Sequence, residues 1–171
     1  MSKHTYSPGP SKEYIRNSVF LHFIECTYVL TLPNLYFGLE KMLLDDGKQV
    51  DCTEYEVNTF EGQKQIAPPG ITLYNLDVKD LNLSKYDGVF LDFMGTFNRH
   101  TPGIMKQLHS GTRIAMTFMM ARENKTLQQE IDITNREESY VKLLSKHNVH
   151  IEKYANYCDT TPMCVFFGHK I

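Results

Sequence analysis

The chain has 171 residues, of which 42% are hydrophobic and 22% charged, with a formal net charge of −2. This near-neutral balance excludes an overall basic field that would attract nucleic acid or an anionic membrane, so any such partner must bind a local patch. No segment approaches the roughly 18 consecutive apolar residues of a membrane span. We expect a soluble, intracellular (cytoplasmic) protein with a flexible N-terminus at residues 1–10 and a single domain at residues 11–171.

The distribution of cysteine and histidine indicates no metal site. The cysteines are far apart in the sequence, without a C-x-x-C pair, and none of the seven histidines has the i, i+4 spacing with a glutamate that is typical of zinc. We predict four reduced cysteines in the core, because three of them fall in apolar, strand-like runs. The four are Cys26, Cys52, Cys158 and Cys164.

Helical and strand-like runs alternate along the chain until two strands follow each other directly. Helices are predicted after Ser11, before Gly47, at about 58–65, between Thr101 and Gly111, and after Thr134. Strands are predicted at 28–33, 49–56, 71–78, 86–95, 112–120, 149–157 and 162–170.

Three helices have specific features in the sequence. The first is expected to bury Tyr14, Val19, Leu21, Phe23 and Ile24. In another, Thr101 is predicted as the cap and Pro102 as the first helical residue. In the third, Thr134 and Glu137 match a capping box, in which each side chain satisfies a backbone amide near the other.

This order of elements predicts an α/β fold with a doubly wound, mostly parallel seven-stranded sheet. Strands joined through helices are parallel, whereas the terminal pair, joined by a turn at residues 159–162, must be antiparallel. The last strand should therefore be reversed. The organisation resembles that of the Rossmann-like (class I) methyltransferases that use S-adenosylmethionine, over nearly the whole chain from Tyr28 onward.

The resemblance implies a cofactor site at the ends of the first three strands. The loop "LTLPNLYFGLE" matches the family's glycine-rich loop but has a single glycine, and Pro33, Asn34 and Gly38 are expected to build its tight turn. Glu54, with Glu56 as the alternative, matches the acid that accepts hydrogen bonds from the ribose hydroxyls.

After the third strand, "LYNLDVKDL" matches the segment beside the adenine. The resemblance assigns Asp77 as the acceptor of the adenine amine and places Val78 beside it, with Asn75 as a further contributor.

The stretch "YDGVFLDFMGTFNRH" places an acid where a buried strand leaves the sheet. Asp92 resembles the polar head of the motif with which amino-group methyltransferases hold their target amine, with Phe93 beside the cofactor. The resemblance therefore implies that Asp92 orients the acceptor or contacts the methionine moiety of the cofactor. In the alternative interpretation, Asp92 only caps the following turn.

The residues themselves indicate a surface for phosphates and bases. The loops after the fourth and fifth strands should open on the same edge of the sheet and carry cations close to aromatic residues. We predict that a nucleic acid or nucleotide acceptor binds there, and solvated loop charges are the alternative. The residues assigned to this surface are Phe97, Arg99, His100 and Arg122.

Two other functions remain compatible with the sequence. The poor glycine loop favours a methyltransferase-like subunit that has lost catalysis and binds a partner protein. Another Rossmann-like enzyme, such as a nucleotide-binding reductase, fits less well because the reversed terminal hairpin resembles the methyltransferases.

Overall fold

The computed structural model describes residues 12–33, 36–93, 95–120, 135–158 and 161–171. The helices are α1 (Lys12–His22), α2 (Gly38–Asp45), α3 (Val57–Ile66), α4 (Thr101–Gln107) and α5 (Arg136–Ser145). The strands are β1 (Tyr28–Thr31), β2 (Gln49–Thr53), β3 (Ile71–Tyr74), β4 (Gly88–Asp92), β5 (Arg113–Met119), β6 (Val149–Cys158) and β7 (Pro162–Lys170). Short 3-10 turns, Val78–Asp80 and Leu83–Lys85, stand between β3 and β4 in place of a helix.

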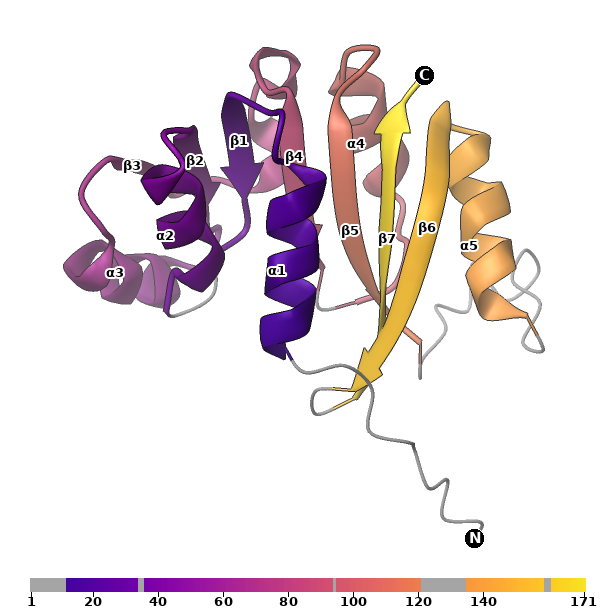
Figure 1. The fold of residues 1–171 in the computed structure, drawn as a ribbon, viewed down its shortest axis with the longest axis horizontal. Coiled ribbons are helices and arrows are strands. Elements are labelled where there is room, and N and C mark those ends of the chain that lie inside the picture. Colours follow the sequence, from indigo (N-terminus) through magenta and orange to yellow (C-terminus); the bar gives the residue numbers. More distant parts are fainter. Residues whose placement is uncertain (1–11, 34–35, 94, 121–134, 159–160) are drawn as a thin grey trace, which may run out of the picture.

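All seven strands form one sheet in the order β3-β2-β1-β4-β5-β7-β6 (Figure 1). Neighbouring strands from β3 through β5 are parallel, and β7 runs antiparallel to both β5 and β6. The predicted doubly wound, mostly parallel sheet with a reversed last strand is therefore confirmed. The strands β1 to β5 all end at the same edge, which we call the carboxyl edge.

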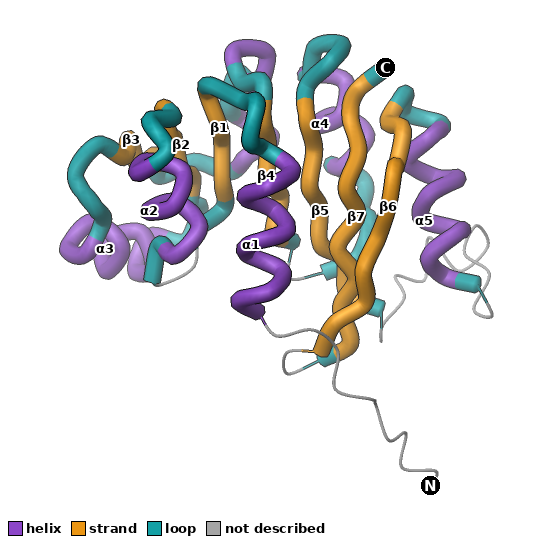
Figure 2. Tube along the Cα trace, viewed as in Figure 1, coloured by secondary structure: helices purple, strands orange, loops and turns teal. Residues whose placement is uncertain are grey.

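Helices cover both faces of the sheet, with α1 and α2 on one side and α4 and α5 on the other (Figures 1 and 2). Successive residues of the central strands point to opposite faces, so Leu30 and Ile114 pack under α4 and α5, while Val29 and Ala115 pack under α1 and α2. Burial on both faces explains why these strands are continuous apolar runs in the sequence.

The helix α1 buries a different face from the one predicted. Ile15, Val19 and Phe23 are buried at intervals of four residues, whereas Tyr14 is 57% exposed and Leu21 is 63% exposed. The prediction was wrong for Tyr14, Leu21 and Ile24 because the whole segment is rich in apolar residues, and only the i, i+4 spacing identifies those that face the sheet.

Other expectations about single residues are corrected. Cys158, at the end of β6, is exposed, while the other three cysteines are buried. The helix α4 begins one residue earlier than predicted, with His100 at the cap position and no side-chain cap. The hydroxyl of Thr101 instead accepts a hydrogen bond from the backbone amide of Asn98. Ser11, Thr134 and the predicted capping box lie outside the described residues.

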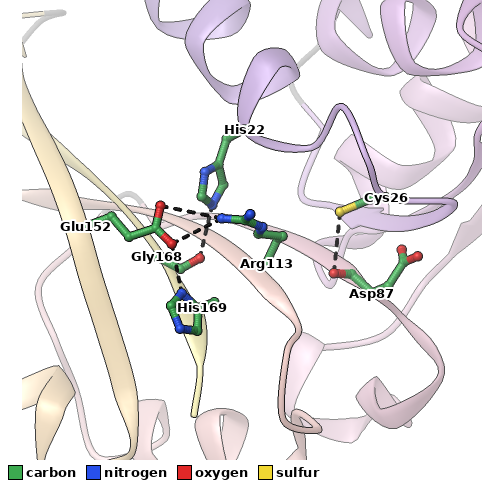
Figure 3. A network of polar contacts seen from close by, with 7 residues as sticks. All are labelled: His22, Cys26, Asp87, Arg113, Glu152, Gly168 and His169. Atoms are coloured by element: carbon green, nitrogen blue, oxygen red, sulfur yellow. Dashed lines mark hydrogen bonds and ion pairs between the residues drawn. The ribbon is translucent and has the colours of Figure 1, made fainter.

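A polar network links α1 to the strands at the edge opposite the carboxyl edge (Figure 3). His22 donates from Nε2 to the carbonyl of Gly168 at 3.0 Å. Glu152 pairs with Arg113 at 3.1 Å and with His169 at 2.8 Å. The His22 hydrogen bond attaches the C-terminal end of α1 to β7, and the two pairs of Glu152 connect β6 with β5 and β7. The attached end sets the position of the N-terminal end of α1 at the carboxyl edge.

Candidate functional site

A cavity of about 460 Å³ opens at the carboxyl edge, beside the ends of β1 and β4. Its volume lies within the range of roughly 300–1,000 Å³ that is usual for small-molecule sites. Its walls come from α1, the loop after β1, α2, α3, β4 and the β6–β7 hairpin. The lining side chains are those of Lys12, Ile15, Arg16, Val19, Leu32, Pro33, Tyr36, Leu39, Glu40, Thr59, Gln63, Phe90, Asp92, Tyr157, Thr161 and Met163.

Glu40 places a carboxyl group in this wall from the first turn of α2. Its side chain is 3% exposed, and its Oε1 accepts a hydrogen bond from the hydroxyl of Thr31 at 2.7 Å. Burial raises the pKa of Glu40, although the Thr31 hydroxyl and the charge of Arg16 act in the opposite direction. Asp92 also raises the pKa of Glu40 through its charge, so the two acids interact across the cavity.

Asp92 is held in a fixed orientation at the end of β4. The hydroxyl of Thr117, on the neighbouring strand β5, donates to Asp92 Oδ1 at 2.6 Å. Asp92 lines the cavity, where its carboxylate could meet a ligand. Phe93 instead packs on the core, with its ring stacked on that of Phe118 at 5.9 Å.

Gln63 contributes a buried amide to the wall from α3. It is 1% exposed, and its Nε2 donates to the carbonyl of Pro33 at 3.1 Å. The Oε1 atom of the same amide is buried without a hydrogen-bond partner in the described part of the chain. An unpartnered buried acceptor is costly and is therefore informative about the site.

The residue at the cap position of α2 has a glycine-like backbone conformation without being a glycine. Phe37 adopts φ 50 and is fully buried, so its side chain stays in the core while its backbone takes the left-handed conformation that glycine favours. Gly38 does not have a positive φ. Gly38 leaves space for Arg16, because a Cβ on Gly38 would lie 2.6 Å from the guanidinium of Arg16. Asn34 lies outside the described residues.

The residues assigned to the ribose and adenine stand at the same edge but outside the cavity lining. Glu54 Oε1 accepts from the backbone amide of Glu56 at 2.8 Å, and the side chain of Asn75 donates to the carbonyl of Glu54 at 2.8 Å. Asp77 caps the 3-10 turn through the amide of Lys79, and Val78 is 7% exposed. The structure therefore brings Glu54 and Asn75 together, beside the β2 and β3 ends.

The loop after β4 presents only part of the predicted acceptor surface. Arg99 and His100 are exposed, and Arg99 Nε donates to His100 Nε2 at 3.2 Å. Phe97 is 3% exposed and packs between Phe118 and His147, so its ring is part of the core and offers no free face to a base. Arg122 lies outside the described residues.

Sequence reasoning missed the residues that give the cavity its polarity, namely Arg16, Glu40 and Gln63. The position of Glu40 was a usable signal. It lies three residues before Leu43 and thus on the buried side of α2, where an acid is rarely placed without a partner or a role. Arg16 and Gln63 had no comparable signal, because charged and amide residues are ordinary on exposed helices.

Among the residues that the structure describes, no group of three or more metal-binding side chains is present. Within the same residues, no helix has both the length and the apolar character needed to cross a bilayer.

Comparisons with known proteins identify the fold. Neither a family model nor a curated protein matches the sequence. The structure, however, is similar to N-methyltransferase NodS from Bradyrhizobium japonicum, with a TM-score of 0.65, 7% identity and coverage of 94% of this chain and 97% of that one. It is also similar to the tRNA methyltransferase TrmK from B. subtilis, with a TM-score of 0.66, 11% identity and coverage of 96% and 68%.

The third similar protein is a methyltransferase of a small molecule. It is the 1,6-didemethyltoxoflavin-N1-methyltransferase from Burkholderia thailandensis, with a TM-score of 0.66, 11% identity and coverage of 91% and 76%. The chain thus has the Rossmann-like class I methyltransferase fold that the sequence predicts. Because these proteins act on different acceptors and share little sequence with the chain, the similarity defines the fold and leaves the substrate to be argued from the site.

Proposed function

We propose that the chain is an S-adenosylmethionine-dependent methyltransferase that uses the cavity at the carboxyl edge. The observation that carries this proposal is the position of the cavity, beside the loops after β1 and β4 of a class I methyltransferase fold. Open α/β sheets bind ligands outside the carboxyl ends of their strands, where the strand order reverses, and here β1 and β4 are the neighbouring strands at that point.

The charges of the cavity suit the amino-acid end of the cofactor. Lys12 and Arg16 lie on the α1 side, and Glu40 and Asp92 lie on α2 and β4. A zwitterion with a carboxylate and an ammonium group matches such a pair of cations and acids. We assign Pro33 and Arg16 to the binding of the amino-acid end of the cofactor. Gly38 contributes by leaving space for the Arg16 guanidinium.

The adenosine end is assigned to the adjacent loops. Glu54 would bind the ribose, and Asp77 and Val78 would border the adenine. The carboxylates of Glu54 and Asp77 now accept hydrogen bonds from nearby backbone amides, and on binding they would accept hydrogen bonds from the ligand instead.

Asp92 is the residue assigned to the acceptor, with Phe93 supporting it from the core. The bound cofactor supplies an electrophilic methyl group, and the chain contributes alignment and a shaped pocket. The Thr117 hydroxyl fixes Asp92 so that its carboxylate accepts an N–H of the acceptor and orients the nitrogen. Apolar residues of the lining, including Leu32, Phe90 and Met163, would limit the access of water to that position.

Isothermal titration of S-adenosylmethionine into the wild type and Asp77→Ala tests the cofactor assignment. We expect micromolar affinity that weakens at least about tenfold in the variant, about 1.4 kcal/mol. Asp80→Ala is the matched control, because Asp80 lies exposed on the same 3-10 turn. Equal affinity of Asp77→Ala and the wild type would remove Asp77 from the site.

We further propose that the acceptor is a nucleic acid or a nucleotide. Arg99 and His100 support this, because they are exposed cations or potential cations on the loop that follows Asp92. Binding of a fluorescent oligonucleotide should weaken in Arg99→Glu and should keep its affinity in Lys106→Glu, a charge reversal on α4. Unchanged affinity in Arg99→Glu would contradict a role of this loop in acceptor binding.

One observation favours a second function, that of a binding or assembly subunit without catalysis. The loop after β1 has one glycine where the family it resembles usually has two or three, and Phe37 takes a left-handed backbone conformation there in place of a glycine. A wild-type protein that binds neither S-adenosylmethionine nor S-adenosylhomocysteine would favour this function over the enzyme.

A further inference from the structure

Gln63 is a buried polar residue of the cavity wall, and its hydrogen bonding within the described residues is incomplete. Its amide nitrogen is used by the carbonyl of Pro33, and its Oε1 is buried without a partner in the described part of the chain. The orientation of the amide follows from this contact, because a flipped amide would bring two oxygens together. The Pro33 carbonyl is thus already hydrogen-bonded by the amide nitrogen of Gln63, and the acceptor that remains available is Gln63 Oε1.

Gln63 lines the cavity, so a hydrogen-bond donor that enters the cavity can supply the partner of Gln63 Oε1. The atom is shielded from water, since Gln63 is 1% exposed, so bulk solvent does not satisfy it. A buried acceptor that loses its water and gains no donor destabilises the folded protein. A ligand that brings an N–H to this position removes that cost on binding.

The surrounding charges select the kind of donor. Glu40 and Asp92, the two acids of the lining, approach the cavity from α2 and β4, and Lys12 and Arg16 approach from α1. Glu40 is 3% exposed, so its carboxylate is poorly solvated, and a cation nearby would favour its ionised form. An ammonium group can bind a carboxylate as well as an amide oxygen, and so it suits these acceptors better than a neutral N–H donor does.

We propose that Gln63, together with Glu40, binds the ammonium group of the amino-acid end of the ligand, and that Gln63 is therefore a specificity-determining residue. This inference rests on the proposed function, since it concerns the same cavity. It assigns to α3 a recognition role that the resemblance did not imply for any residue of that helix.

Two adenosine ligands separate this role from a structural one. S-Adenosylhomocysteine carries the amino-acid end, whereas 5′-methylthioadenosine keeps the adenosine and the thioether but lacks that end. In titration calorimetry, Gln63→Met should lower the preference for S-adenosylhomocysteine over 5′-methylthioadenosine by at least about tenfold, because it removes a hydrogen bond to a charged group. The affinity for 5′-methylthioadenosine should stay within about threefold of the wild type.

A conservative variant and a control complete the experiment. Gln63→Glu keeps an acceptor oxygen but loses the donor to Pro33, so it should retain the preference if ammonium binding is the role. Lys64→Met, an exposed neighbour on α3, should behave as the wild type. Circular dichroism melting of each variant verifies that it is folded.

The outcomes distinguish the two proposals. A wild type that binds neither ligand would overturn the proposed function and this inference together. Wild-type binding with an unchanged preference in Gln63→Met, or an equal loss for both ligands, would overturn the inference alone. An equal loss would mean that Gln63 only fixes the loop after β1.

Discussion

Asp51 shows how one buried carboxylate organises the sheet away from the cavity. It is 1% exposed in the middle of β2, and its Oδ2 accepts hydrogen bonds from the hydroxyls of Tyr28 and Tyr86 and from the ammonium of Lys85. Burial alone would raise the pKa of Asp51, but these three donors hold it below its ordinary value. Lys85 also lies over the Tyr28, Tyr74 and Tyr86 rings, at 4.8–5.4 Å from their centroids.

Removing one donor from this carboxylate should destabilise the protein. Tyr86 is fully buried and its hydroxyl lies 2.7 Å from Asp51, so Tyr86→Phe should lower the free energy of unfolding by about 1.5–3 kcal/mol. Tyr154→Phe is the control, because Tyr154 is 45% exposed, and it should change stability by no more than about 0.5 kcal/mol. Urea unfolding of the two variants measures the difference, and equal stabilities would contradict the role of Asp51.

Substitution of Gly38 tests whether the position of the Arg16 guanidinium in the cavity matters for ligand binding. An alanine at this position would direct its Cβ at the Arg16 guanidinium, which must then move, while the helix α2 itself gains from the replacement of a glycine. Gly38→Ala should therefore bind S-adenosylhomocysteine at least about tenfold more weakly without loss of stability.

The matched control for Gly38 is Gly62 of α3, where a Cβ would have no neighbouring atom within 4 Å. Gly62→Ala should raise the free energy of unfolding by about 0.5–1 kcal/mol and leave the affinity unchanged. Weaker binding in both variants would indicate a general effect of glycine replacement and not the displacement of Arg16.

At individual positions, the sequence predicted polar residues at strand ends better than it predicted exposure. Asp92 could be placed at the cavity because the apolar run before it marks a buried strand, whose end is fixed by the fold. Phe97 was assigned to a surface because it lies in a loop next to cations. Its burial depends on Phe118 and His147, which are 21 and 50 residues further along the chain, and local sequence contains no information about such contacts.

The helices were predicted by position more reliably than by the face they bury. The order of helices and strands follows from periodicity and from turn residues, and it determined the sheet correctly. For α1 the apolar residues cover more than one face, so the buried face is decided by the fixed position of its C-terminal end on β5 and β7.

The burial of α1 can be tested by two variants of similar chemistry. Val19 is fully buried, whereas Leu21 is 63% exposed. Val19→Ala should lower the free energy of unfolding by about 1–3 kcal/mol, because it removes methyl groups from a packed core, and Leu21→Ala should lower it by no more than about 0.5 kcal/mol. Chemical denaturation of both proteins measures this, and a larger loss in Leu21→Ala would support the face that the sequence predicted.

In the whole molecule, the two edges of the sheet have different tasks. The carboxyl edge carries the cavity and its charged lining, while the opposite edge carries the network of His22, Arg113, Glu152 and His169 that fixes α1 (Figure 3). Because α1 spans from one edge to the other and provides Arg16 to the cavity, the network at one edge supports the site at the other.

This network should make stability depend on pH. Burial lowers the pKa of His22 below its ordinary value of 6.5, and the charge of Arg113 acts in the same direction, opposed by the Gly168 carbonyl and Glu152. A histidine with a lowered pKa in the folded state contributes stability above its unfolded pKa, and this contribution is lost as the pH falls through the folded value. Glu152 behaves in the same way at lower pH. Burial would raise its pKa, but the hydrogen bond from His169 and the charge of Arg113 hold it below its ordinary value of 4.5.

The histidine contribution can be isolated with His22→Gln, which keeps a side-chain N–H for the Gly168 carbonyl but does not titrate. Between about pH 7.5 and about pH 5.5, roughly one unit on either side of the ordinary histidine pKa, the wild type should lose more stability than His22→Gln. The exposed His109→Gln should follow the wild type. Urea unfolding across this range measures the free energies, and parallel curves for the wild type and His22→Gln would show that folding does not change the titration of His22.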